Sequence, residues 1–302
     1  MITENKLTTI NSKLPPINKK EPPRSVNPDL TSCYFSAMFI GAKNSGKTYG
    51  LCAWIRNYEA QPIKNSDGQT VPIRIILFCP TANSQANPVY KTLKNLDEED
   101  IILQYTDSEL DSKIEDIKKN KEEIEDYTLY LKTWKKFLKI DENINLLHPE
   151  ELLILSKFDF MDPKHLNKPK FWPVAPVVFL ILDDLIGSND CFKKGNSYIS
   201  NLTIKHRHYG INLIFTSQNP RSIPNIIRNN IDVYALYKFA NVKMVLEKIF
   251  EEVSNILTEE KFEELYKHAT EKPHDCLVID THPSTDRDKR LRRNFDNVLI
   301  IT

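Results

Sequence analysis

The sequence predicts an α/β fold with a central, mostly parallel sheet flanked by helices, and two observations support this prediction. Short apolar runs alternate with segments of helical periodicity, which is the chain order of parallel strands joined by crossover helices. In addition, only 7 glycines occur in 302 residues, and three of them, Gly41, Gly46 and Gly50, fall within one block of ten. Such a cluster between an apolar run and a helix indicates a tightly folded loop at the end of a strand.

The composition excludes several classes of protein. With 40% hydrophobic residues, the chain is globular rather than disordered. No apolar run approaches the ~20 residues of a membrane helix, so we expect no membrane span. The five cysteines form no CxxC pair, unlike those of a zinc site or a disulfide scaffold. The 41 basic and 41 acidic side chains give zero net charge, so any binding of nucleic acid depends on local patches.

Five apolar runs are the predicted strands of the sheet. They are Tyr34–Ile40, Ile73–Cys79, Val177–Leu182, Ile211–Thr216 and Val233–Phe239. Val177–Leu182 is apolar at every position, as expected for a strand that is buried on both faces at the centre of a parallel sheet. Helices are predicted between most of these strands, the first of them over Thr48–Tyr58.

Residues 1–30 contain five prolines and are predicted to form a flexible arm, which leaves residues 31–302 as one domain. Within that domain, residues from about 90 to 165 are predicted to be a helical insertion. Apolar residues recur there at steps of three, four or seven from Leu110 to Leu138, flanked by dense charge. One helix over Asp107–Lys139 would be about 50 Å long, so the sequence also allows a helical hairpin. The insertion is either a lobe with a solvated charged face or a lid or subunit-contact arm.

The C-terminal region, from about residue 241 to 302, is predicted to combine helices and strands. Helices are expected over Asn241–Lys267, and strands over Cys276–Asp280 and Val298–Ile301. Between these strands lies a basic segment, Arg287–Arg293, which is either a contact for nucleic acid or a solvated basic turn.

The glycine-rich loop matches the pattern GxxxxGK[ST], which cradles phosphates. The predicted nucleotide-binding residues are Gly41, Ala42, Lys43, Asn44, Ser45, Gly46, Lys47, Thr48 and Tyr49. The glycines allow successive N–H groups to point at phosphate oxygens, and the following helix adds the positive end of its dipole. We expect Lys47 to reach the β- and γ-phosphates and the Thr48 hydroxyl to bind Mg²⁺. The alternative is an incidental glycine turn, but the strand before it and the helix after it favour the phosphate loop.

Two acids end the most apolar predicted strand. Asp183 and Asp184 follow Leu182 at the carboxyl end of the strand, where α/β sheets bind their ligands. Asp183 is the expected partner of Mg²⁺, directly or through water, and Asp184 is placed to orient or deprotonate an attacking water. An ordinary acidic turn is the alternative, and the phosphate loop makes it the weaker one.

Polar groups also follow the predicted strand Ile211–Thr216. Gln218 could hydrogen-bond the γ-phosphate or the attacking water, whereas Ser217 or Thr216 could instead cap the next helix. Upstream of the strand, the basic stretch 205–208 includes Arg207. From the residues alone, this stretch could face the nucleotide of a neighbouring subunit or contact DNA phosphates, and its basic side chains suit both roles equally. A small-molecule kinase also stays an alternative, although such enzymes usually lack the second acid and the strand-end glutamine.

Taken together, these motifs resemble the FtsK–HerA superfamily of DNA-pumping P-loop ATPases. The most specific part is the string from Arg207 through Gly210 to Gln218, which continues through Asn219, Pro220 and Arg221 and later through 227–232. The similarity is strongest to the genome-packaging ATPases of poxviruses, giant DNA viruses and virophages. It covers roughly Ser36–Cys79 and Val177–Phe239, and it does not cover the helical insertion or the C-terminal region.

The resemblance implies a RecA/ASCE-like P-loop NTPase fold, with ATP and Mg²⁺ as cofactors. It also implies that Lys47, Asp184, Gln218 and Arg207 are catalytic. Gln218 would sense the γ-phosphate, and Arg207 would act on a neighbour's nucleotide, with Arg228 as a second candidate. Many relatives have glutamate where this chain has Asp184, which is one methylene shorter in its reach toward water.

The function implied by the resemblance is that of an ATP-driven motor that moves double-stranded viral DNA into a capsid. Its expected partners are DNA phosphates, capsid or procapsid components and further copies of the chain in a pentameric or hexameric ring. Its expected location is the host-cell cytoplasm at the site of viral assembly, the virion, or both. The alternative is a nucleotide-gated assembly or scaffold ATPase that does not move DNA.

Overall fold

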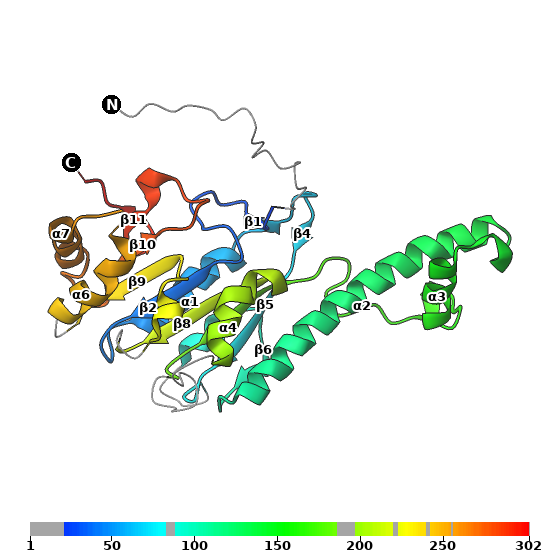
Figure 1. Cartoon of the computed structure of the whole chain (residues 1–302), viewed down its shortest axis with the longest axis horizontal. Helices are drawn as coiled ribbons and strands as arrows, with labels where there is room; N and C mark the ends of the chain where they lie inside the picture. Colours follow the sequence, from blue (N-terminus) through cyan, green and yellow to red (C-terminus); the bar gives the residue numbers. More distant parts are fainter. Residues whose placement is uncertain are drawn as a thin grey trace, which may run out of the picture.

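The computed structural model describes residues 21–82, 88–185, 197–219, 223–239, 242–254 and 256–301. It confirms the α/β fold, because a nine-stranded sheet crosses the body of the molecule with helices on both faces (Figure 1). Its strand order is β12-β11-β10-β9-β2-β8-β7-β5-β6. No helix among the described residues is long and apolar enough to cross a membrane.

Six neighbouring strands of this sheet are parallel. They are β9 (Val233–Tyr237), β2 (Ser36–Ile40), β8 (Ile211–Ser217), β7 (Val177–Leu182), β5 (Ile73–Phe78) and β6 (Leu96–Ile102). All five predicted strands are therefore present and adjacent. Three antiparallel strands extend one edge: β10 (Cys276–Asp280), β11 (Leu291–Arg293) and β12 (Asn297–Val298). The carboxyl ends of β2, β7 and β8 meet at one edge of the sheet, and the predicted site residues follow these ends.

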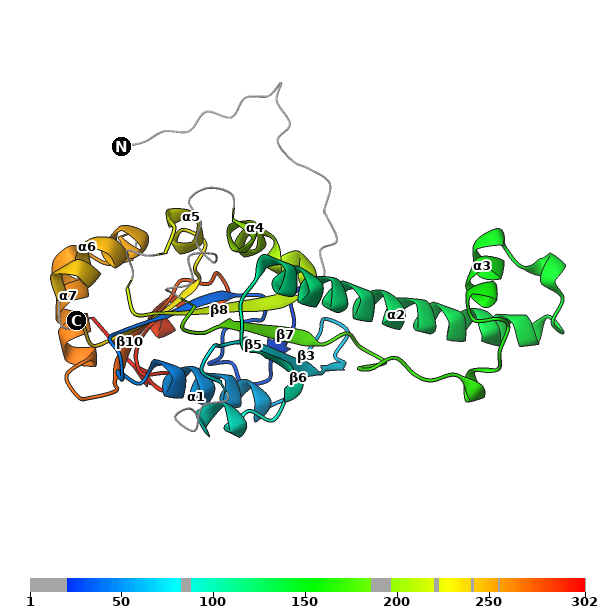
Figure 2. The same ribbon diagram turned by 90° about the horizontal axis from the view of Figure 1, so that it is seen from below.

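The sheet separates two large apolar cores, which explains why β7 is apolar at every position. Phe179 and Ile181 face one core with Trp54 of α1 (Lys47–Glu59), whereas Leu180 and Leu182 face the other. The second core is covered by the first turns of α2 (Asp107–Lys139) and by four further helices, and Figure 2 shows α4 and α5 on the face opposite α1. These helices are α4 (Tyr198–Lys205), α5 (Asn225–Arg228), α6 (Val242–Val253) and α7 (Glu259–Ala269).

The long helix forms with the predicted bounds, as the single element α2 (Asp107–Lys139), and it does not break into a hairpin. The Thr106 hydroxyl caps it by accepting the Glu109 amide, and no glycine or proline interrupts it. α2 projects from the body as an arm, and α3 (Pro149–Lys157) packs against its distal half (Figures 1 and 2). A separate small core around Tyr130, Phe137 and Leu155 stabilises this distal part.

The predicted start of the helical insertion near residue 90 is wrong, because residues 96–102 form strand β6 of the main sheet. Four consecutive acids, residues 97–100, concealed this strand from a pattern based on hydrophobicity, and the buried one is Asp100. Its carboxylate accepts two hydrogen bonds from Arg74 of β5 at 2.8 Å each. The helical segment therefore begins at Asp107.

Residues 1–20 of the predicted N-terminal arm lie outside the described residues. The last part of the arm, residues 21–30, is not wholly without secondary structure, in contrast to the prediction of a flexible arm. Arg24–Ser25 (β1) pairs with Ile63–Lys64 (β3), which pairs with Thr70–Val71 (β4), so part of the arm belongs to a small antiparallel sheet. At the other terminus, the predicted strand Val298–Ile301 is reduced to β12, and β11 lies within the basic segment. Short 3-10 helices occur at Pro88–Thr92 (η1), Ile144–Leu146 (η2), Pro163–His165 (η3), His206–Tyr209 (η4) and Arg287–Lys289 (η6).

Candidate nucleotide-binding site

The phosphate loop connects the end of β2 to the first residue of α1. The Gly41 amide donates to Ser217 O at 3.1 Å, which fixes the loop to the end of β8. A Cβ on Gly41 would lie 2.5 Å from Cβ of Tyr237, so only glycine allows this approach to β9. Gly46 precedes α1 with φ of 98°, a left-handed conformation that favours glycine. Two of the motif's glycines are thus required by the backbone.

Gly50 lies within α1, and the structure gives it a reason that the motif does not. A Cβ at this position would lie 1.8 Å from the phenol oxygen of Tyr237, which is fully buried on β9. The glycine therefore allows α1 to pack closely against the sheet beneath the loop.

Lys47 extends from the start of α1 back over the loop. Its Nζ donates to Gly41 O and Ala42 O, each at 2.9 Å. Partial burial lowers the pKa of Lys47, while the nearby carboxylates of Asp183 and Asp184 act in the opposite direction. The ammonium group therefore lies where a phosphate could replace the two carbonyl oxygens as its partner.

The two acids after β7 have different environments. Asp183 is only 3% exposed, and its carboxylate accepts hydrogen bonds from the Thr216 hydroxyl and the Tyr90 phenol. Asp184 is exposed and adopts φ of 52°, and its amide donates to the Thr216 hydroxyl at 3.0 Å. Thr216 thus connects both acids to the end of β8, which is a different role from the helix cap considered from the sequence.

Gln218 lies beside Asp184. Its Nε2 donates to Oδ1 of Asp184 at 2.8 Å, although the two residues follow different strands. The structure therefore brings the predicted sensor and the predicted base into direct contact. Pro220 and Arg221, which continue the string that carries the resemblance, lie outside the described residues.

These groups open into one cavity of about 830 Å³ at the carboxyl ends of the strands. Its lining consists of Lys43, Asn44, Ser45, Gly46, Lys47, Thr48, Tyr49, Thr81, Asp183, Asp184, Thr216, Gln218 and His274. The Thr48 hydroxyl and the Asp183 carboxylate are the hard oxygen donors that Mg²⁺ prefers, and both face this cavity, so these residues fit the ion. Tyr49 is 69% exposed at the rim.

Three residues at the site have no signal in the sequence: Thr81 and His274, which line the cavity, and Tyr90, which contacts Asp183. Tyr90 lies in η1 and reaches Asp183 from 93 positions away in the chain. His274 comes from the turn before β10, with φ of 69°, and packs against Gly46 at the rim of the cavity. None of the three belongs to a motif, and only the folded chain brings them to the cavity or to Asp183.

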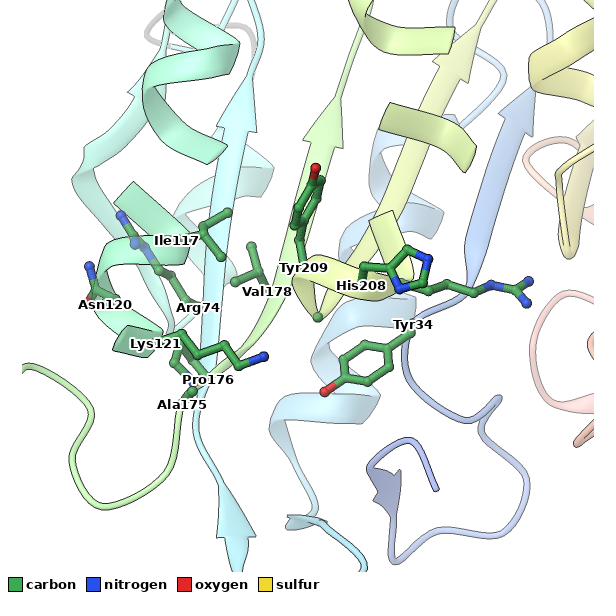
Figure 3. Close-up of a pocket in the computed structure, with 12 residues that line it drawn as sticks. Tyr34, Arg74, Ile117, Asn120, Lys121, Ala175, Pro176, Val178, His208 and Tyr209 are labelled. Atoms are coloured by element: carbon green, nitrogen blue, oxygen red, sulfur yellow. The ribbon is translucent and has the colours of Figure 1, made fainter. Parts of the chain in front are cut away.

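Arg207 lies far from this cavity, because η4 precedes β8 and Gln218 follows it. Its Nη2 pairs with Asp232 at 2.8 Å and 3.0 Å, and the side chain is 52% exposed. Arg207 also lines a pocket of about 170 Å³ at the amino ends of the strands, where Lys121 and Tyr34 point toward each other (Figure 3). Arg207 therefore does not meet the phosphate loop of its own chain.

The second arginine candidate is not available at the surface. Arg228 is 5% exposed and donates to Ile223 O and to Asn225 Oδ1, each at 2.6 Å. It also pairs with Glu252 at 3.3 Å. These contacts give Arg228 a structural role within the helices around α5.

Much of the basic segment Arg287–Arg293 is engaged in ion pairs within the chain. Lys289 pairs with Asp29 at 2.6 Å, and Arg293 pairs with Asp275. Arg292 is 5% exposed and donates to Asp29 O at 2.9 Å. Most of the segment thus joins parts of the fold, and Arg287 is its exposed basic residue.

No family model and no curated protein matches this chain. Its structural neighbours include the genome-packaging NTPase B204 from Sulfolobus turreted icosahedral virus 2, solved with ATP-γ-S. The TM-score is 0.44 at 13% identity, over 91% of this chain and 100% of that one. The type VII secretion ATPase EccC from Thermomonospora curvata aligns with a TM-score of 0.38 at 12% identity, over 81% of this chain and 24% of that one. EssC from Geobacillus thermodenitrificans aligns with a TM-score of 0.41 at 14% identity, over 82% and 38%. These similarities are distant, with sequence identities of 12–14%.

Proposed function

We propose that this chain is an ATPase that uses Mg²⁺. One observation carries the proposal: the phosphate loop, Asp183 and the Asp184–Gln218 pair all face a single cavity at the carboxyl ends of the strands. In that cavity Lys47 would leave its two backbone carbonyls for the β- and γ-phosphates. Thr48 and Asp183 would hold Mg²⁺, which neutralises charge on the phosphate oxygens when it is bound.

In this proposal, Asp184 and Gln218 act on the water that attacks the γ-phosphate. Asp184 is exposed at the cavity, where it can accept a proton from water. Gln218 donates to that carboxylate at 2.8 Å, so an amide drawn toward a γ-phosphate would release Asp184 for the water. Nucleotide binding and activation of the water are then linked through one hydrogen bond.

We further propose that ATP hydrolysis drives double-stranded viral DNA into a capsid. The string from Arg207 to Gln218 supports this through its resemblance to DNA-pumping ATPases. The position of Arg207 is consistent with a ring, because an exposed arginine at the opposite end of β8 from its own phosphate loop could act on a nucleotide only at the site of a neighbour, after leaving its partner Asp232. Partners in this reading are DNA phosphates and capsid components, and the location is the viral assembly site in the host cytoplasm or the virion.

The test is the rate of ATP hydrolysis with and without double-stranded DNA across a range of salt concentrations. A DNA motor should hydrolyse ATP faster with DNA, and the stimulation should fall as salt rises because contacts to phosphates release counterions. Lys47→Ala should abolish hydrolysis in both conditions and controls for contaminating ATPases. Absence of ATPase activity in the wild type would overturn the proposal that this chain is an ATPase.

A scaffold ATPase is the second candidate, and the projecting arm favours it. Leu146 and Leu153, near the distal end of the arm, are 61% and 72% exposed, as expected of a surface that could contact another protein. Such a protein would hydrolyse ATP at a rate that does not change with DNA. The same measurement therefore separates the two functions.

A further inference from the structure

Tyr90 reaches the most buried carboxylate of the nucleotide site from an unexpected part of the chain. It lies in η1, between β5 and β6, and is 3% exposed. Its phenol donates to Oδ2 of Asp183, and the Cys79 thiol lies 3.5 Å from the same oxygen. The other oxygen, Oδ1, accepts the Thr216 hydroxyl.

These three donors restrict how Asp183 can act. An ionised carboxylate offers about four lone-pair positions, so most of them are taken by groups of the chain. Rotation of the carboxylate would break the bonds to Tyr90 and Thr216 together. Asp183 is thereby fixed with its remaining acceptor capacity available to the cavity that it lines.

The ring of Tyr90 is itself held in place. It belongs to the core on the α1 face, together with Leu93 and Cys52. The chain just after η1 is tied to α1, because the amides of Lys94 and Asn95 donate to Oε1 of Glu59 at 2.8 Å and 2.9 Å. The phenol therefore approaches Asp183 from a rigid base, as a positioning group requires.

We propose that Tyr90 is a positioning residue that holds Asp183 in the orientation needed to bind Mg²⁺ with the nucleotide. The role rests on the proposed ATPase function and goes beyond it, because no motif assigns Tyr90. Tyr90 acts through Asp183 and does not itself touch the nucleotide or the ion.

The test is Tyr90→Phe, which keeps the buried ring and removes only the hydroxyl. Binding of a fluorescent ATP analogue is titrated with Mg²⁺, and binding is also measured in EDTA. The Mg²⁺ concentration for half-maximal binding should rise about tenfold, since a hydrogen bond to a charged group is lost. Binding in EDTA should not change, and hydrolysis should recover when Mg²⁺ is raised to saturation.

Tyr105→Phe is the matched control. Tyr105 is 5% exposed, and its phenol donates to Oδ1 of Asp107 at 2.6 Å, away from the residues that line the cavity. Tyr105→Phe should keep the wild-type Mg²⁺ midpoint. A wild-type midpoint in Tyr90→Phe, or equal weakening with Mg²⁺ and in EDTA, would overturn the role of Tyr90. Loss of Mg²⁺-dependent binding in the wild type would instead overturn the proposed ATPase.

Discussion

The close packing of Gly50 on Tyr237 shows that the phosphate-binding pattern describes only part of its own loop. The pattern specifies Gly41, which approaches Tyr237 closely, and Gly46, which has a left-handed backbone conformation, and both shape the predicted phosphate loop. Gly50 is instead required by packing, because the buried phenol of Tyr237 on β9 occupies the space that a side chain at position 50 would need. A site motif and a packing requirement therefore overlap within ten residues.

We predict that Gly50→Ala destabilises the protein, by about 1–3 kcal/mol, as expected for overpacking in a well-packed core. The new methyl group would lie 1.8 Å from the phenol oxygen of Tyr237. In a Tyr237→Phe background the nearest atom is a ring carbon at 3.1 Å, so the penalty should be smaller. The free energies of unfolding from urea denaturation of the four proteins check this, and equal penalties in both backgrounds would contradict it.

Gln218→Ala should lower the turnover of ATP by about a hundredfold, the usual scale of a lost acid–base arrangement. The reason is the bond from Gln218 Nε2 to Asp184 Oδ1, which in the proposed mechanism would link the γ-phosphate to the base. Nucleotide affinity should change little, because in the proposed site the loop and Lys47 would supply most of the phosphate contacts. Steady-state kinetics and a binding titration measure both quantities. Gln69→Ala, at an exposed glutamine in the turn between β3 and β4, serves as the control.

Motif residues could be predicted because their spacing along the chain is itself the signal. Asp183 and Gln218 directly follow strands, Lys47 and Thr48 follow the loop after a third strand, and adjacent parallel strands bring these ends together. Tyr90 could not be predicted, since its contact with Asp183 depends on how η1 packs after β5. The burial of Arg228 could not be predicted either, because the sequence does not show which oxygen atoms the folded chain brings to an arginine side chain.

The helix α2 could be predicted from the sequence pattern, whereas the strand β6 could not. The bounds of α2 were predictable, because a threonine cap, a regular apolar repeat and the absence of glycine and proline are all local features. β6 was missed, because its buried Asp100 looks like a surface residue until Arg74 of the next strand is placed beside it. The bounds of a helix can therefore be predicted from local signals, whereas a strand with polar residues can be recognised only when its partner in the sheet is known.

We predict that Asp100→Asn destabilises the protein, by about 3–5 kcal/mol at neutral pH, because it leaves the buried Arg74 guanidinium without its main counter-charge. The matched control is Asp116→Asn. Asp116 pairs with the same guanidinium, but its side chain is 43% exposed, so a smaller loss is expected. Urea denaturation of the three proteins measures the difference, and equal losses in both variants would contradict the prediction.

The same pair should make stability depend on pH. Burial alone would raise the pKa of Asp100, but the hydrogen bonds from Arg74 and Lys113 outweigh it and hold the pKa below its ordinary value. A depressed folded-state pKa gives stability that is present above the unfolded pKa, about 4, and is lost as pH falls through the folded one. The stability gap between wild type and Asp100→Asn should therefore narrow below about pH 4. A constant gap down to acid pH would contradict this.

At the scale of the whole molecule, Arg207 and Gln218 lie at opposite ends of β8, so in the proposed ring they would act on the nucleotides of two different sites. Arg207→Ala protein mixed into wild type should reduce ATP hydrolysis more than in proportion to its fraction, because each variant subunit also impairs a neighbour. The rate is measured across mixing ratios at constant total protein. A strictly proportional decline would argue against action on the neighbour. Mixtures that contain Lys64→Ala, a change at an exposed lysine of β3 in the small sheet, should hydrolyse ATP at the wild-type rate at every ratio.

The seven residues of β8 span about 20 Å, with Gln218 just after one end and Arg207 before the other. If each arginine completes the site of the next chain, competence to hydrolyse ATP belongs to the junction between two chains rather than to either of them. A lone chain then holds two half-sites and no whole one. An open row of chains always lacks one junction, whereas a closed circle lacks none, so closure itself completes the last site.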